Sequence, residues 1–446
     1  MRNKSYAAAG IFLSMVLTGC TVQPEEEPQP KIEIAEITEP ESEAEIVHES
    51  WTEPETDPPA PEEVYLSCLP TVEANSTLKL SDFVTYANVT LKDPYMQIET
   101  GSLGTHEVTI PYYYGKETRE EVVSYQVKDT TPPVILNDGD SAYIKTGEEF
   151  DLRELIGYGD HYDTKLTLTY DGDVNTEVPG TYMLSAYLTD SSGNQSTCRL
   201  NVTVADEEPV NASGSEPVRF EDFKAKYASR KNTSVGVDIS SWQGNVDFDA
   251  LKEAGCEFVI IRIGRSSNYP IIDDYYEQNI KAAKKAGLKV GVYFYTTDTN
   301  EVQIRADADW IAEQLGGYSL DFPIAFDWED FTNFQQYGIN LHDLNLMYQA
   351  FADQMQTNGY KTMLYSSKYF LETVWENPDK EIVWLAHYTE NTNYTGKYYM
   401  WQRCSTGKID GIEGNADFNV YTDEYLTEES VDYAEEITES VTIEEE

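Results

Sequence analysis

Eight short apolar segments follow one another between residues 235 and 420, and helical patterns separate most of them. This alternation limits the fold more than any other feature of the 446-residue chain. Most of the segments are nearly continuous apolar runs, which is typical of parallel strands buried on both faces. The expected strands span residues 235–240, 258–264, 289–296, 322–329, 361–366, 382–388, 398–404 and 416–420.

Helices are expected after the first five of these strands only. The chain between the later strands is too short for another helix, and two of the expected helices end at glycine, a helix-stop signal. The pattern predicts a modified TIM-type barrel of the (β/α)5(β)3 kind over residues 232–421, smaller than an ordinary eightfold barrel. The expected helices span residues 247–254, 274–286, 301–315, 341–358 and 368–374.

Four acidic residues lie at or near the ends of expected strands or within them: Asp238, Asp327, Glu329 and Asp417. Catalytic residues of such barrels lie at the carboxyl ends of the strands. Alternation along a strand places Asp327 and Glu329 on one face and Trp328 on the other. Two adjacent carboxylates split their pKa values, which glycoside hydrolysis requires. Any one of these residues could instead serve a cap or loop, but four together favour a catalytic site.

Residues 64–206 have a different pattern, with short alternating strands and frequent turn signals. The segment repeats itself at an offset of about 75 residues: 78–84 resembles 150–156, and 103–109 resembles 179–185. Regular short strands of this kind indicate all-β sandwiches. We therefore predict two copies of one module, over residues 64–130 and 131–206, and a linker over 207–231.

No metal site or cofactor is predicted. The cluster from Asp160 to Asp163 leaves Ca²⁺ binding as an alternative, but it does not match an EF-hand loop, and its residues are more typical of a turn. Cys68, Cys198, Cys256 and Cys404 are far apart and form no CxxC pair, so neither a zinc site nor a disulfide pairing is predicted.

The charge of the chain is concentrated near its ends. The formal net charge is −49, which argues against nucleic acid as a partner because duplex binding requires Lys and Arg to neutralise phosphates. Residues 21–63 carry 15 acidic residues against the single basic Lys31, and residues 422–446 carry 11 acidic and no basic ones. Neither segment has a hydrophobic period, so both are expected to be disordered.

The first 20 residues fit a secretory signal. Arg2 and Lys4 precede an apolar run over 7–17, which is too short for a stable transmembrane helix. The following Leu17-Thr-Gly-Cys20 resembles the bacterial lipoprotein box. That resemblance implies lipidation at Cys20, removal of residues before it, and attachment of the protein by lipid alone to the extracellular face of the cytoplasmic membrane, within the cell wall.

The two modules resemble the immunoglobulin-like modules of bacterial surface proteins. The similarity rests on Asp-Thr-Thr-Pro-Pro at 129–133, Pro-Gly-Thr-Tyr at 179–182 and Asp-Ser-Ser-Gly-Asn at 190–194, and the second copy fits better. In that family such modules mostly act as spacers and sometimes as adhesins, so a spacer role is expected here.

The barrel resembles glycoside hydrolase family 25, the muramidases. Motifs that follow in the family's order lie at 236–244, 258–262, 286–293, 326–329, 364–366, 383–386, 401–402 and 414–419. The family pattern differs at Ser241, at Tyr293–Tyr295 and at Arg403, but every carboxylate is present.

This resemblance implies cleavage of the β-1,4 bond between N-acetylmuramic acid and N-acetylglucosamine in peptidoglycan by a monomer without a cofactor. It implies Glu329 as general acid, Asp327 as its partner, and Asp238 and Asp417 as further active-site acids. The resemblance also places Tyr293, Tyr365 and Trp384 along the sugar groove. A surface protein that binds glycan without cutting it is the competing hypothesis.

Overall fold

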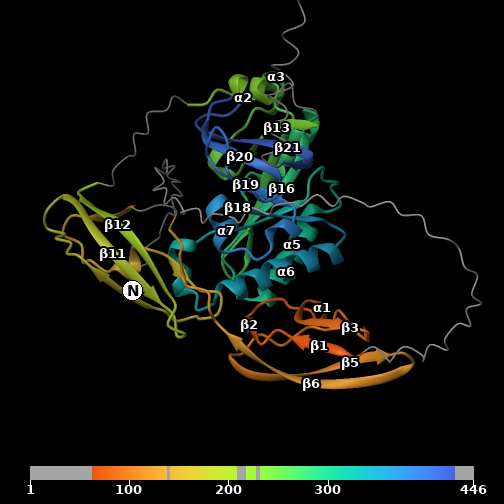
Figure 1. Ribbon diagram of the computed structural model, residues 1–446. Helices are drawn as coiled ribbons and strands as arrows, with labels where there is room; N and C mark the ends of the chain where they lie inside the picture. Colours follow the sequence, from red (N-terminus) through yellow and green to blue (C-terminus); the bar gives the residue numbers. More distant parts are fainter. Residues whose placement is uncertain (1–62, 138–140, 208–216, 228–231, 427–446) are drawn as a thin grey trace, which may run out of the picture.

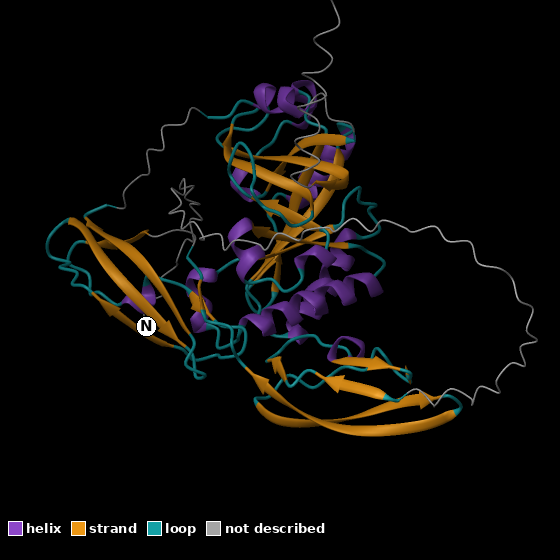
Figure 2. Cartoon of the chain, in the orientation of Figure 1, coloured by secondary structure: helices purple, strands orange, loops and turns teal. Residues whose placement is uncertain are grey.

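The computed structural model describes residues 63–137, 141–207, 217–227 and 232–426. The expected signal peptide, the lipidation site Cys20, the acidic segment up to residue 62 and the tail from 427 lie outside these residues. The first part of the tail expected to be disordered, residues 422–426, instead continues the last strand of the barrel, Ala416–Leu426. Figure 1 shows the two β modules beside the barrel, and Figure 2 shows the barrel strands flanked by helices. Within the described residues, no helix has the length and apolar content needed to cross a bilayer.

The first module has a four-stranded sheet in the order β2-β6-β5-β4 and a two-stranded sheet of β1 and β3. Its core contains Leu80, Phe83 and Ile110, which are almost fully buried. The elements are β1 (Tyr65–Cys68), β2 (Thr71–Glu73), α1 (Leu80–Phe83), β3 (Val84–Ala87), β4 (Thr90–Leu91), β5 (Gly104–Tyr114) and β6 (Glu117–Lys128).

The second module repeats this plan, with a four-stranded sheet in the order β10-β11-β12-β8 and a pair of β7 and β9. In both modules a short strand joins the long hairpin in parallel, β2 with β6 and β8 with β12. The sequence echo at 78–84 and 150–156 covers the short helices α1 and η1. The elements are β7 (Val134–Ile135), β8 (Ser141–Lys145), η1 (Leu152–Glu154), β9 (Tyr158–Gly159), β10 (Thr167–Asp171), β11 (Gly180–Thr189) and β12 (Gln195–Ala205).

Alternation explains the long hairpin of the second module. Leu184, Ala186 and Leu188 of β11 are fully buried, and the residues between them are partly exposed. Strand side chains point to opposite faces in turn, so one face of this hairpin makes the core of the module.

Each of the eight expected barrel segments contains one strand, and each expected helical segment contains one helix. The elements are β13 (Thr233–Ile239), η2 (Ser241–Gln243), α3 (Phe248–Ala254), β14 (Phe258–Ser266), β15 (Pro270–Ile272), α4 (Tyr276–Lys285), β16 (Lys289–Thr296), α5 (Glu301–Leu315), β17 (Ile324–Trp328), η3 (Phe331–Gln336), α6 (Leu341–Thr357), β18 (Thr362–Ser367), α7 (Lys368–Thr373), η4 (Pro378–Lys380), β19 (Val383–Ala386), β20 (Tyr398–Gly407) and β21 (Ala416–Leu426).

The barrel sheet closes on itself. Its order is β13-β21-β20-β19-β18-β17-β16-β14-β15, and an additional parallel pairing of β13 with β14 completes the ring. The short β15 extends β14 as a hairpin, a strand that the sequence pattern did not predict. The interior holds a smaller cluster around Phe258, Ala325 and Trp384, and a larger cluster lies between strands and helices.

Two expectations about the barrel were wrong. Strand β21 is antiparallel to both of its neighbours, β20 and β13, whereas the apolar pattern suggested parallel strands. Only residues 408–415 connect β20 to β21, and a parallel return needs a crossover of a dozen or more residues.

The expected linker over 207–231 was also wrong for part of its length. Residues Phe220–Tyr227 form helix α2, and Phe220 and Phe223 are buried against Phe418 of β21 with ring centroids 5.0 and 5.2 Å apart. Aromatic side chains of this size bury large apolar areas. The helix therefore belongs to the barrel.

The second module contacts the barrel at η3, the segment that follows β17. The Gln335 side chain donates to the carbonyl oxygens of Arg153 and Ile156 at 2.9 and 3.3 Å and accepts from the amide of Tyr158 at 3.4 Å. The Tyr369 hydroxyl of α7 donates to the carbonyl oxygen of Ile135 at 2.6 Å.

The same module reaches the start of α6. The Leu341 amide donates to the carbonyl oxygen of Asp160 at 2.7 Å, and Asn340 Nδ2 donates to that of Tyr162 at 2.9 Å. A helix leaves its first amides without partners inside the helix, so the module supplies one here. His161, in the same segment, lies 3.5 Å from the carboxylate of Glu376. The second module is thus packed on the barrel rather than held apart from it.

Candidate active site

Four acidic side chains meet at the mouth of the barrel. Asp238 of β13 and Asp417 of β21 are direct partners across the antiparallel pair, and hydrogen bonding also joins their side chains. Asp327 is the second-last residue of β17 and Glu329 directly follows that strand. Both lie close enough to Asp238 for its charge to act on them. We call Asp238, Asp327, Glu329 and Asp417 the mouth carboxylates. The structure therefore brings together all four acids that the sequence singled out.

Side-chain alternation along β17 separates its two faces as expected. Ala325 lies in the interior cluster of the barrel. Trp328 points outward and packs edge-on against Phe331 and Phe334 of η3, at 5.1 and 5.7 Å between ring centroids. Asp327 shares the face of Ala325, because their positions differ by two. The buried Trp328 therefore fixes the outer side of β17 while its carboxylate faces the mouth.

The mouth favours protonated acids. Burial, and then the charge of Asp238, raises the pKa of Glu329 to about 7. Burial and the neighbouring Glu329 charge also raise the pKa of Asp327 above its usual range, and the Arg262 guanidinium opposes this effect. Burial, Asp238 and Glu329 raise the pKa of Asp417 as well. Removing charges from water and placing like charges together both disfavour ionisation, so the site holds protons near neutral pH.

Asp238 has its own set of hydrogen bonds. Its Oδ2 accepts from Gln402 Nε2 at 2.8 Å and from Asn419 Nδ2 at 2.7 Å. These bonds favour the ionised form, whereas burial raises the pKa of Asp238 to about 6. The Asn419 oxygen in turn accepts from Trp384 Nε1 at 2.9 Å. Asp238 is thus the mouth carboxylate whose orientation is most firmly fixed.

Gln402 is itself held by two tyrosines. The hydroxyls of Tyr365 and Tyr388 donate to its Oε1 at 2.8 and 2.9 Å. Because the two hydroxyls occupy the Gln402 side-chain oxygen, the Nε2 group is the end that faces Asp238. The tyrosines therefore set the orientation of the Gln402 side chain.

Arg262 is the cation beside Asp327 and Tyr293. Its side chain is paired with Asp273, at 2.7 and 2.8 Å, and donates to Ser241 Oγ at 2.8 Å. Asp273 thus neutralises much of the arginine charge, which leaves Asp327 without a full counter-ion. One oxygen of Asp327, Oδ1, is buried without a hydrogen-bond partner within the described part of the chain.

The predicted groove aromatics lie together in the barrel interior. The Trp384 ring is 4.7 Å from Tyr365 and 6.3 Å from Tyr293, both edge-on. Trp384 is only 2% exposed, so little of its ring is accessible to a sugar. Its polar contact is the hydrogen bond to Asn419. By contrast, Trp242, on η2 directly after β13, is 74% exposed and offers a free ring face near the mouth.

Sequence reasoning did not select Gln402, Asn419, Tyr388 or Arg262 as site residues. All but Tyr388 stand inside the motifs quoted for the barrel, so the motif positions themselves were a usable signal. Tyr388 ends an expected strand, and its role becomes visible only when β19 and β20 pair.

A group of three carboxylates that could hold a metal ion lies elsewhere in the described residues, at Asp129, Asp163 and Asp190. Within the described residues, the mouth carboxylates do not form a group of three that could hold a metal ion. Cys68, Cys198, Cys256 and Cys404 are free thiols.

Two family models match parts of the chain. Residues 237–412 match the model of glycosyl hydrolases family 25. Residues 134–204, in the second module, match the bacterial surface protein Ig-like domain.

Two curated relatives each match less than half of the chain. The chain is 30% identical over 193 residues to an autolytic lysozyme of Clostridium acetobutylicum, covering 43% of this chain and 56% of that protein. It is 27% identical over 199 residues to lysozyme M1 of Streptomyces globisporus, covering 42% of this chain and 67% of the other. The chain thus spans little more than half the length of the first of these relatives.

A solved structure of a bacterial lysozyme from Streptomyces coelicolor is 24% identical, with a TM-score of 0.37, and covers 43% of this chain and 92% of that one. From the two family models, the chain carries a family 25 glycosyl hydrolase domain preceded by a bacterial surface Ig-like domain.

Proposed function

We propose that the chain is a muramidase that hydrolyses the β-1,4 bond between N-acetylmuramic acid and N-acetylglucosamine in peptidoglycan, using a (β/α)5(β)3 barrel. The observation that carries this proposal is the carboxylate pair of the buried Asp327 and the partly exposed Glu329, with the pKa of Glu329 raised to about 7. The names of the matched relatives, an autolytic lysozyme and lysozyme M1, support the same reaction.

Glu329 is the proposed general acid. With a pKa of about 7, much of this carboxyl is protonated at neutral pH, whereas an ordinary glutamate is ionised there. It would donate its proton to the glycosidic oxygen of the departing N-acetylglucosamine as the bond from that oxygen to C1 breaks. A catalytic acid is most effective when its pKa lies near the working pH.

Asp327 is proposed to act on the 2-acetamido group of the substrate. Once Glu329 is protonated, its charge no longer disfavours ionisation of Asp327, and Arg262 favours the carboxylate. The unpartnered Oδ1 could then accept the acetamido N–H. That contact would orient the acetamido oxygen toward C1, where it forms the new bond. Such assistance by the substrate is a known exception to a carboxylate nucleophile.

The second half of the reaction returns Glu329 to its starting state. The Glu329 carboxylate would take a proton from water as the water oxygen bonds to C1 and the acetamido oxygen leaves. Asp238, fixed by Gln402 and Asn419, and Asp417 beside it are proposed to hold polar groups of the sugar. The exposed Trp242 and the partly buried Tyr293 are proposed to contact sugar faces.

The test is digestion of purified peptidoglycan by the chain after residue 20, followed by identification of the new reducing ends. N-Acetylmuramic acid at the new ends is the expected result. New ends of N-acetylglucosamine would indicate a different glycosidase. Binding without any new reducing end would favour the competing hypothesis of a glycan-binding surface protein.

We also propose that Cys20 carries the lipid anchor, that the protein is a monomer on the outer face of the cytoplasmic membrane, and that both β modules are immunoglobulin-like sandwiches. The signal-like start and the Leu17–Cys20 motif support the anchor. Cys20→Ala should move the protein from the membrane fraction into the medium in its source bacterium. Continued membrane attachment of that variant would contradict the anchor.

A further inference from the structure

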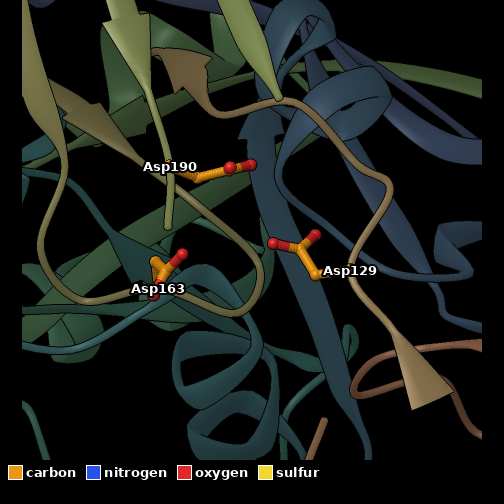
Figure 3. Close-up of side chains that lie close together, drawn as sticks. All are labelled: Asp129, Asp163 and Asp190. Atoms are coloured by element: carbon orange, nitrogen blue, oxygen red, sulfur yellow. The ribbon is translucent and has the colours of Figure 1, made fainter. Parts of the chain in front are cut away.

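The junction between the two β modules brings four aspartates together. Asp129 follows β6 of the first module, and Asp160, Asp163 and Asp190 belong to the second. Figure 3 shows Asp129, Asp163 and Asp190 grouped around one space. One carboxylate oxygen from each of these three lies within 4.8 Å of the others. We call the four residues the junction carboxylates.

The spacing of these oxygens suits one cation. Three oxygens that each lie about 2.4 Å from a central ion are at most about 4.8 Å apart, and Ca²⁺ binds oxygen ligands at roughly 2.3–2.6 Å. The donors are all carboxylate oxygens, which suit hard cations rather than zinc or copper. They come from three separate loops, and Ca²⁺ accepts such irregular arrangements more readily than Mg²⁺.

Unpartnered buried oxygens point to a missing ligand independently of the clustering. Asp129 is 7% exposed and Asp160 is 0% exposed, yet Oδ2 of each has no hydrogen-bond partner within the described residues. A buried carboxylate oxygen left without a partner is costly, so such groups are normally paired or bound to metal. None of the four aspartates forms an ion pair with a described Lys, Arg or His.

Backbone amides hold the carboxylates in place. Asp160 Oδ1 accepts from the amides of Tyr162 and Asp163 at 2.7 and 2.8 Å. Asp163 Oδ2 accepts from Ser191 N at 2.9 Å. These bonds orient the acids toward one another without neutralising them.

Asn194 links the two modules at this point. Its Nδ2 donates to Asp190 Oδ2 at 2.8 Å and to the backbone carbonyl oxygen of Asp129 at 3.2 Å.

We propose that Asp129, Asp163 and Asp190, with Asp160 beside them, bind one Ca²⁺ ion that fixes the first module to the second. The ion would offset the repulsion among the carboxylates and supply a partner for Asp129 Oδ2. The carbonyl oxygen of Asp160 accepts from the first amide of α6, and Asn75 of the first module donates to the carbonyl oxygen of His161 at 2.8 Å. The ion would therefore order the segment that joins both modules to the barrel.

Calcium titration of the metal-free chain after residue 20, by calorimetry, tests this site directly. We expect one ion per chain with a Kd of about 10⁻³ M or tighter, and at least tenfold weaker binding of Mg²⁺. Asp129→Asn and Asp190→Asn should each weaken Ca²⁺ binding at least tenfold. The matched control is Asp173→Asn, at an exposed position of the second module, which should bind as the parent does.

Thermal unfolding gives a second measurement that separates a metal ligand from a structural carboxylate. Ca²⁺ at saturation should raise the Tm of the parent by about 2–5 °C relative to chelator. Asp129→Asn should lose this rise, and its Tm in chelator should equal or exceed that of the parent because repulsion is relieved. The absence of saturable Ca²⁺ binding by the parent, equal affinity for Mg²⁺, or an Asp129→Asn variant that responds like the parent would each overturn the proposal.

Discussion

The mouth carboxylates and the junction carboxylates are two groups of four buried or partly buried acids with different surroundings. At the mouth, side-chain amides of Gln402 and Asn419 contact Asp238, Arg262 faces Asp327, and burial raises the pKa of Glu329 to about 7. At the junction, backbone amides fix the acids. The difference shows how one residue type serves two chemistries: a group that must exchange a proton needs a raised pKa and access, whereas a group that binds a cation needs converging, ionised oxygens.

The largest effect is expected from removing the proposed general acid at the mouth. Glu329→Gln keeps the shape of the side chain but removes the transferable proton, so turnover on peptidoglycan should fall by roughly 10²–10⁴-fold. Reducing-end assays measure this loss. The control Glu313→Gln, on the exposed face of α5, should keep parental turnover.

Thermal unfolding of the same variant shows whether the mouth and the junction act independently. Glu329→Gln should keep the Ca²⁺-dependent rise in Tm, because the junction lies outside the barrel mouth. Turnover within about threefold of the parent would show that another residue is the acid.

The next effect tests whether the second module is structurally part of the enzyme. A Cβ at Gly157 would overlap the backbone carbonyl of Phe331 in η3. Gly157→Ala should therefore cost about 1–3 kcal/mol in the free energy of unfolding and reduce turnover, because η3 follows Glu329 closely. Urea unfolding and the cleavage assay measure the two effects.

Gly180→Ala is the matched control for Gly157→Ala. A Cβ at Gly180, on β11, meets only the Tyr182 side chain at 3.8 Å. It should leave turnover unchanged. Equal behaviour of the two alanine variants would support the spacer role that the sequence suggested for the modules.

The pH dependence of stability should reveal both groups. Folding raises the pKa of Asp129 and Asp238 to about 6 and that of Glu329 to about 7, from 3.8 and 4.5. The unfolded chain ionises first, so this stability is fully present below pH 4 and is lost as pH rises to about 7.

Unfolding in chelator at several pH values should show a decline on the order of 1–3 kcal/mol between pH 4 and 7. Asp129→Asn should remove only the part of this decline that comes from the junction carboxylates. Saturating Ca²⁺ should remove the same part in the parent. A stability that rises steadily through this range would contradict raised pKa values in both groups.

The smallest expected effect concerns the orientation of Asp238. Gln402→Met removes one amide donor from its carboxylate, and that donor favours the ionised form. The pKa of Asp238 should rise, and the acidic limb of the pH profile of kcat/KM should move up by about 0.5–1 pH unit. Gln335→Met, which alters the module contact instead, should leave the position of this limb unchanged.

Much of the barrel could be predicted from sequence because its signals are local. The apolar runs that became β14 and β16, the helix at Glu301–Leu315 and the alternation that turns Asp327 inward all depend on neighbours within a few residues. The catalytic roles of the four mouth acids stay predictions, although the structure brings those acids together.

The remaining features depend on where distant parts of the chain return. Gln402 and Asn419 stand 164 and 181 residues from Asp238, whose carboxylate they bind. Neither the docking of Gly157 on η3 nor the contact of α2 with β21 leaves a periodic signal.

The sequence by itself determined the barrel segments, the repeat of the β modules and which residues share a face of β17, because side-chain period and turn chemistry act over short distances. Only the tertiary structure decided that β21 runs antiparallel, that the second module packs on η3, and that Asp129 meets Asp163 and Asp190. These features arise from contacts between segments far apart in the chain, where the free energy of burial and charge depends on which partners the fold brings together.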